Sequence, residues 1–196
     1  MSNIELIKQL RSETGASLAD IKEALVIAKS DLEAARAYLR KKGMAKAEKR
    51  SDKETKQGII ASYIHSNNKI GVLVEINCET DFVAKTEEFN QLGKDIAMQV
   101  CAMSPLYIDE VDIPASIRQE FEREVMNDPN FADKPEQVKT NIIDSKMKNY
   151  AAQYCLLKQV FFKDGTQTIE DLLKSVSGKL GEAIRIRRFV RFEVGE

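Results

Sequence analysis

The 196-residue sequence has no tryptophan, one histidine and three cysteines. Because His65 is the only imidazole, a nucleophile of the Ser–His–Asp type would have to form around a predicted strand residue with no serine or cysteine motif beside it. His65 is therefore interpreted as structural. The cysteines are odd in number and widely spaced, which favours a reducing cytosol over a disulfide framework. Cys78 and Cys101 fall on apolar stripes, as inert core thiols do.

Motifs for metals, nucleotides and membranes are also missing. No HExxH, CxxC or EF-hand spacing occurs, so no metal site is expected, and no GxxxxGK or GxGxxG loop is present to cradle a nucleotide cofactor. No run approaches eighteen apolar residues, which argues against a membrane span. The opening MSNIELIKQLRSETG carries early acids and indicates a helix rather than a signal or transit peptide. We expect a cytoplasmic protein without metal, cofactor or membrane contact.

Excess charge of either sign is absent as well. The chain has 30 basic and 31 acidic residues, a net charge of −1, so as a whole it lacks the positive surface of a nucleic-acid-binding protein. Its 43% hydrophobic content is ordinary for a globular protein. The length suits one medium domain and one small one.

Apolar residues recur every three or four positions in the first 43 residues and predict a small domain of three short helices. Capping boxes are expected at Ser17 with Asp20 and at Ser30 with Glu33. Gly43 is expected to end the third helix. Residues 44–57 are mostly charged and lack an apolar stripe. They are interpreted as a solvated, partly helical linker, with a charged binding patch as the alternative.

Residues 58–196 have the pattern of an α+β core with an antiparallel sheet packed against helices. A strand from residue 58 to 65, a turn, and an alternating strand from 70 to 78 predict a hairpin, followed by a helix from about residue 86. Further helices and a closing strand complete the α+β order. The apolar residues of the closing strand are expected to share one face: Ile184, Ile186, Val190, Phe192 and Val194.

The segment from Asn77 to Val83 lies at the predicted strand-to-helix junction, outside both periodic patterns. One interpretation makes Thr80 or Asp81 a helix N-cap and Phe82 a staple onto the core. The other makes the segment a loop, held by the scaffold, that offers an acid beside an aromatic ring for binding. The residues alone leave both open.

Several long stretches resemble the elongation factor Ts family. INCETDFVAKTEEF resembles the characteristic motif of that family, and RSETGASLADIKEALVIAKSDLEAARAYLRKKG resembles its ubiquitin-associated-like domain. GIIASYIHSNNKIGVLVEINCETDFVA and IRIRRFVRFEVGE are also similar to it. The resemblance runs from end to end, with the motifs in the order of the family.

The resemblance implies a guanine-nucleotide exchange factor, not an enzyme, that promotes GDP release from elongation factor Tu during translation elongation. It also implies binding through the N-terminal helices and the core. Thr80, Asp81, Phe82 and Val83 correspond to the motif that dislodges the partner's magnesium ion. The N-terminal docking region corresponds to Leu18, Ala19 and Asp20.

The sequence departs from the family pattern in three places. Ala19 is small where larger apolar residues are frequent, and Gln99 stands where many members have histidine, which leaves any role of that side chain open. Many members also carry a second core lobe with an inserted helical hairpin, whereas this chain resembles the short form. A symmetric homodimer is therefore predicted.

Two other classes of function remain as alternatives. The three-helix module could act alone as a ubiquitin-type or peptide-binding adaptor. The terminal strand, with its interleaved arginines and phenylalanines, could bind single-stranded RNA, although its alternation is that of a half-buried strand with a charged outer face. Neither class explains the Thr80–Val83 junction.

Overall fold

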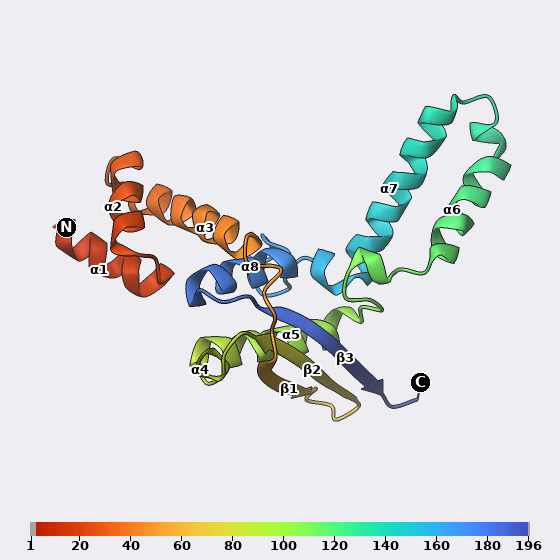
Figure 1. Cartoon of the computed structure of the whole chain (residues 1–196). Coiled ribbons are helices and arrows are strands. Elements are labelled where there is room, and N and C mark those ends of the chain that lie inside the picture. The colour runs from red at the N-terminus through yellow and green to blue at the C-terminus, as the bar shows by residue number, and fades with distance from the viewer. Residues whose placement is uncertain (1–2, 196) are drawn as a thin grey trace. The chain divides into compact units, whose positions relative to one another are not determined.

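A computed structural model describes residues 3–195 and confirms the α+β class, with helices and one antiparallel sheet (Figure 1). The chain divides into two compact units, Met1–Met98 with Asp171–Glu196, and Gln99–Glu170. The predicted domain boundaries at residues 43 and 57 differ from this division into units, and they remain a prediction. Among residues 3–195, no helix is both long and apolar enough to cross a membrane.

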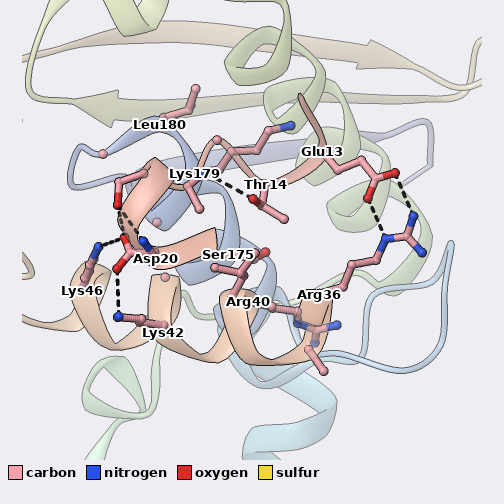
Figure 2. Close-up of a pocket in the computed structure, with 18 of the residues that line it drawn as sticks. Glu13, Thr14, Asp20, Arg36, Arg40, Lys42, Lys46, Ser175, Lys179 and Leu180 are labelled. Carbon is pink, nitrogen blue, oxygen red and sulfur yellow. Dashed lines mark hydrogen bonds and ion pairs between the residues drawn. The ribbon is translucent and has the colours of Figure 1, made fainter. Parts of the chain in front are cut away.

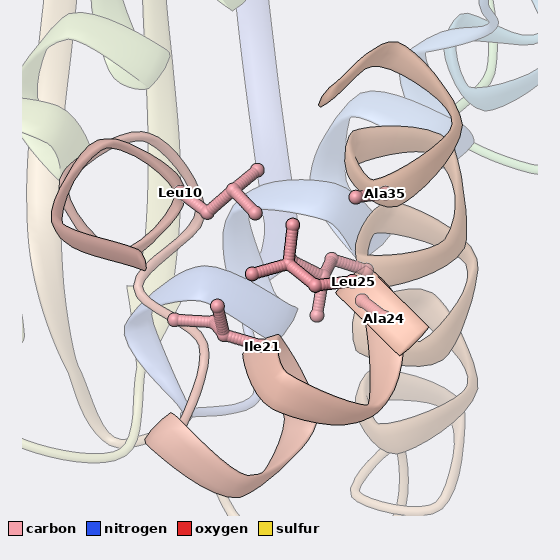
Figure 3. Close-up of a cluster of buried hydrophobic side chains, with 6 residues drawn as sticks. Leu10, Ile21, Ala24, Leu25 and Ala35 are labelled. Carbon is pink, nitrogen blue, oxygen red and sulfur yellow. The ribbon is translucent and has the colours of Figure 1, made fainter. Parts of the chain in front are cut away.

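Three helices open the first unit, as predicted: α1 (Asn3–Thr14), α2 (Leu18–Ile27) and α3 (Leu32–Glu48). The Ser17 hydroxyl accepts the Asp20 N–H at 3.2 Å, so Ser17 caps α2 as expected. The Asp20 carboxylate accepts the Ser17 hydroxyl, in place of the backbone N–H that a full capping box would use. The second expected cap is shifted by one residue, because Asp31 rather than Ser30 caps α3. The three helices enclose a small apolar core (Figure 3) of Leu10, Ile21, Ala24, Leu25, Ala35 and Leu39.

The expected end of the third helix at Gly43 is wrong. Helix α3 continues through Gly43 to Glu48, into the segment interpreted as a linker. Gly43 instead allows α3 to lie close to α8 (Ile169–Leu180). A Cβ at Gly178 of α8 would lie 2.6 Å from the Gly43 carbonyl carbon and oxygen. Two glycines facing each other let these helix backbones meet more closely than side chains would allow.

The sheet has the order β1-β2-β3, all antiparallel, with β1 (Gln57–Ile64), β2 (Ile70–Cys78) and β3 (Arg185–Glu193). The hairpin is confirmed. The expected single apolar face of the closing strand is wrong, because Ile76 pairs with Ile186 while Glu75 pairs with Arg188, leaving an extra residue in β3. Such a bulge reverses the alternation. Val190 and Phe192 therefore lie on the face opposite Ile186.

One face of the sheet is covered within the first unit. Its buried residues Val72, Val74 and Ile76 face the core, where α4 (Asp81–Ala84) and α5 (Glu87–Met103) follow β2. A Cβ added at Gly93 of α5 would lie 2.9 Å from the Ile59 side chain, so this glycine lets α5 press onto β1.

The second unit is largely a helical hairpin, in which α6 (Ala115–Asn127) runs beside α7 (Glu136–Tyr154). Ion pairs join the two helices, from Arg118 to Asp144 and from Lys146 to Glu124. Helix α7 ends at Tyr154, and a short 3-10 turn follows. The other short turns are Glu110–Asp112 and Pro129–Phe131.

Candidate functional site

The Thr80–Val83 segment forms the first turn after β2. Thr80 has extended backbone angles, and its hydroxyl accepts the Val83 N–H at 3.4 Å, which makes it the N-cap of α4. Of the two predicted caps, the structure selects Thr80, and Asp81 becomes the first helical residue. The junction is thus a capped turn fixed at the end of a sheet strand.

Phe82 points away from the core. Its side chain is 78% exposed, whereas Val83 and Ala84 are buried. The interpretation of Phe82 as a staple onto the core is therefore wrong, and Val83 packs inward in its place. The ring therefore contributes little to the packing of the core.

Asp81 stands beside Phe82 and forms a surface ion pair with Lys85, with 2.6 Å between Oδ2 and Nζ. The hydrogen bond from Lys85 holds the pKa of the Asp81 carboxyl below its usual range. The carboxylate is therefore ionised at neutral pH. The turn presents a negative charge and an apolar ring side by side.

The residue that anchors this turn has no local signal in the sequence. The carboxylate of Glu182 accepts the backbone N–H groups of Glu79 and Thr80, although it is 103 positions from Glu79 in the chain. Glu79 itself is paired with Arg50, from the segment interpreted as a solvated linker. Periodicity carries no information about contacts between residues so far apart, and only the closure of β3 onto β2 brings them together.

The second predicted group, Leu18, Ala19 and Asp20, opens helix α2. Leu18 is 46% exposed and Ala19 is also exposed. The Asp20 carboxylate turns inward and binds Lys42 at 2.8 Å and Lys46 at 2.6 Å (Figure 2). The hydrogen bond from Lys42, followed by that from Lys46, holds the pKa of the Asp20 carboxyl far below its usual range. Leu18 and Ala19 are exposed to solvent, whereas Asp20 fixes α2 to α3.

Asp20 also lines a cavity of about 770 Å³ in the first unit. Glu13 and Arg36 form a further ion pair there, visible in Figure 2, and this pair with Arg36 lowers the pKa of Glu13 to about 2. The acids of the cavity are thus paired with neighbouring cations and hold α1, α2 and α3 to one another. Asp20 lines this cavity and none of Thr80–Val83 does, so the two predicted groups form separate sites.

Gln99 has an internal role in the second unit. It is fully buried, and its amide nitrogen donates to the Gln159 side chain at 3.2 Å and to the Val160 carbonyl at 3.1 Å. Its amide oxygen accepts the Phe162 N–H at 3.0 Å. The side chain is used to join neighbouring segments, as a buried polar group must be.

Cys78 and Cys155 offer no reactive thiolate. All three cysteines are buried, and burial raises the pKa of Cys78 and of Cys155 to about 11. Both thiols are therefore protonated at neutral pH and act as small apolar residues. The turn at Thr80–Val83 exposes an apolar ring and an ionised carboxylate.

Comparison with known proteins identifies a family that spans the chain. The family model described as Elongation factor TS matches residues 4–196. The chain is 47% identical over 199 residues to elongation factor Ts of Thermosipho melanesiensis, covering 100% of each. It is 48% identical over 192 residues to elongation factor Ts of Syntrophus aciditrophicus, covering 97% of this chain and 95% of that relative. The match takes in both the three helices and the sheet, and the chain belongs to the elongation factor Ts family.

Proposed function

We propose that this chain promotes GDP release from elongation factor Tu by presenting Phe82, with Asp81 beside it, to the part of the partner that holds the magnesium ion. Its family membership supports the role of a nucleotide exchange factor in translation elongation. The observation that carries the proposal is the 78% exposure of Phe82 on a capped turn. The protein would act in the cytoplasm and would make or break no covalent bond.

The physical basis is the sensitivity of the magnesium site. Magnesium neutralises the nucleotide phosphates and demands near-ideal octahedral geometry, so a small displacement of its surroundings weakens nucleotide binding. An apolar ring inserted between helices of the partner would cause such a displacement. Exchange factor and nucleotide then weaken each other's binding by the same factor, as thermodynamic linkage requires.

A second contact is proposed at the N-terminal helices. Leu18 and Ala19 are exposed at the start of α2, next to the loop that joins it to α1. Asp20 would support this contact from within, because its carboxylate is bound to Lys42 and Lys46. The three-helix module thus adds affinity, while Thr80–Val83 acts on the nucleotide site.

We also propose that two copies associate through the outer face of the sheet. Register places Ile64 and Phe192 on the two sides of Gly71, and Leu73 lies between Ser62 and Val190, all on the face opposite the buried residues. Ile60, Ile64, Leu73, Val190 and Phe192 on this face are 39–69% exposed. Exposed apolar residues gathered on one face of a sheet are typical of an interaction surface. A second copy, related by a two-fold axis, would present the same patch.

The test of the main proposal is the rate at which a fluorescent GDP derivative leaves elongation factor Tu, measured by stopped flow with and without this protein. Acceleration that depends on Phe82 is expected. The same rate in the presence and absence of the protein would refute the exchange function. Acceleration that persists without the Phe82 ring would refute the role of this turn.

A further inference from the structure

The carboxylate of Glu182 binds the backbone just ahead of the exposed turn. Its Oε2 accepts the N–H of Glu79 at 3.1 Å and the N–H of Thr80 at 2.9 Å. Its Oε1 accepts the Thr80 hydroxyl at 2.5 Å. The same hydroxyl accepts the Val83 N–H and caps α4. One side chain thus fixes both the backbone that leads into the turn and the cap of the turn.

Glu79, at the end of β2, provides a second carboxylate, which binds the backbone next to Glu182. Glu79 Oε1 accepts the Ala183 N–H at 2.7 Å, and Arg50 donates to both Glu79 oxygens at 3.0 Å. Glu79 is only 18% exposed, and the Ala183 N–H, followed by Arg50, holds its pKa below the usual range. The strand end and the segment after α8 therefore hold each other through two acids.

Glu182 is itself held in place. Helix α8 ends at Leu180, and Gly181 follows with φ of +75°, the left-handed conformation that glycine adopts at helix ends. The Ser177 hydroxyl donates to the Glu182 carbonyl, and Ala183 is buried. The backbone on both sides of Glu182 is fixed, so its carboxylate has a defined direction.

Helix α4 needs this support. It has only four residues, and a single helical turn is unstable in isolation because nucleation is costly. Phe82, at 78% exposure, has few contacts that could hold its own backbone. The turn keeps its shape through groups outside it, and those groups converge on Glu79 and Thr80.

We infer that Glu182 is a positioning residue for nucleotide exchange: by binding the Glu79 and Thr80 backbone and the Thr80 hydroxyl, it holds Phe82 in the orientation that engages the partner. The inference rests on the proposed function of Thr80–Val83. Glu182 is 103 positions from Glu79 in the chain, and it would act on the turn only through its hydrogen bonds to Glu79 and Thr80. A binding group that is ordered before contact loses less entropy on contact.

The experiment compares Glu182→Ala, Glu182→Gln and a charge-matched control, Glu120→Ala, on the exposed surface of α6. The readout is the maximal rate of release of a fluorescent GDP derivative from elongation factor Tu at saturating exchange factor. Glu182→Ala is expected to lower this rate about tenfold, the effect of about 1.4 kcal/mol on a barrier. Glu182→Gln can still accept both backbone N–H groups through its oxygen, and its amide can donate to the Thr80 hydroxyl, so the rate should recover. Glu120→Ala should match the unmodified protein.

Two further measurements distinguish the positioning of Phe82 by Glu182 from a purely structural role of Glu182. Thermal melts on the same samples must show Glu182→Ala folded at the assay temperature, and amide hydrogen exchange should show loss of protection at Glu79 and Thr80. Glu182→Ala and Phe82→Ala should also be non-additive in the exchange rate, because both act through the same ring.

Three outcomes would overturn the inference: a normal rate for folded Glu182→Ala, equal losses in Glu182→Ala and Glu182→Gln, or additive effects with Phe82→Ala. Normal exchange by Phe82→Ala would instead refute the proposed function, and the inference with it. Slow exchange by Phe82→Ala combined with normal exchange by Glu182→Ala would refute the positioning role alone.

Discussion

Replacing Phe82 with alanine should slow nucleotide exchange while leaving the fold nearly as stable. A phenylalanine side chain buries about 200 Å² when it is fully enclosed. At 78% exposure, only about one-fifth of that area is covered in the free protein. At about 25 cal/mol per Å², truncation removes about 1 kcal/mol of folding free energy, a shift of about 2–4 °C in melting temperature for a chain of this size.

The effect on the partner complex should be larger. If the remaining four-fifths of the ring enters a pocket, about 160 Å² leaves water, worth up to about 4 kcal/mol by the same coefficient. Ordering and desolvation reduce this amount, so about 2 kcal/mol is expected, which is typical of a buried aromatic anchor. That loss corresponds to about thirtyfold in the affinity for nucleotide-free elongation factor Tu, or in the exchange rate if the contact forms only as nucleotide leaves.

The assay pairs GDP-release rates with circular dichroism melts on the same samples. Phe82→Leu keeps an apolar side chain and should retain part of the activity. Val111→Ala removes another exposed apolar side chain, 88% exposed, and serves as the control. A fall in stability of 3–5 kcal/mol, the cost typical of truncating a core phenylalanine, together with full activity of the folded fraction would refute the reasoning.

Three further predictions concern affinity, assembly and acid stability. Leu18→Asp should raise the Kd for elongation factor Tu about tenfold or more with the melt unchanged, and an unchanged Kd in calorimetry would exclude this contact. Phe192→Glu should convert a dimer into the 22.1 kDa monomer in sedimentation equilibrium, and a monomer before substitution would remove the dimer. Because the folded-state pKa of Glu13 is lowered to about 2 by Arg36, its contribution to stability is present above about pH 4.5 and is lost as the pH falls toward 2. Glu13→Gln should flatten this acid limb in pH-dependent melts, whereas an unaltered limb would show that the ion pair contributes nothing.

Periodicity predicted the elements of the fold but not the places where backbones meet. The alternation of residues 70–78 located β2 correctly, because side chains on a sheet repeat every two residues. The bulge in β3 could not be predicted, since an extra residue is visible only in the pairing of Glu75 with Arg188 and Ile76 with Ile186. Gly43 was expected to end a helix. The structure shows instead that a glycine is needed there because the backbone of Gly178, more than a hundred residues away in the chain, lies against it.

The local structure of the turn at Thr80–Val83 was predictable only in part. Thr80 follows a strand and precedes a turn, which is a local pattern, and it is the N-cap as expected. The direction of Phe82 was left open because a hydrophobic staple and an exposed anchor have the same local sequence. The structure decides it through Val83, which fills the inward position. Glu182 had no local signal at all.

Phe82 is an exposed aromatic residue in a turn whose backbone is otherwise well held, so residue type and local structure disagree at this position. Thr80 satisfies the rule for a cap, Val83 the rule for burial, and the backbone ahead of them has its hydrogen bonds met by Glu182. Within the turn, Phe82 is the large apolar side chain that stays exposed, and its neighbours hold it in that position instead of letting the turn rotate the ring inward. Sequences that fold well break such rules chiefly where function requires it. A mobile loop with the same ring would point to accidental exposure, whereas a turn braced from two distant segments points to exposure that has a use.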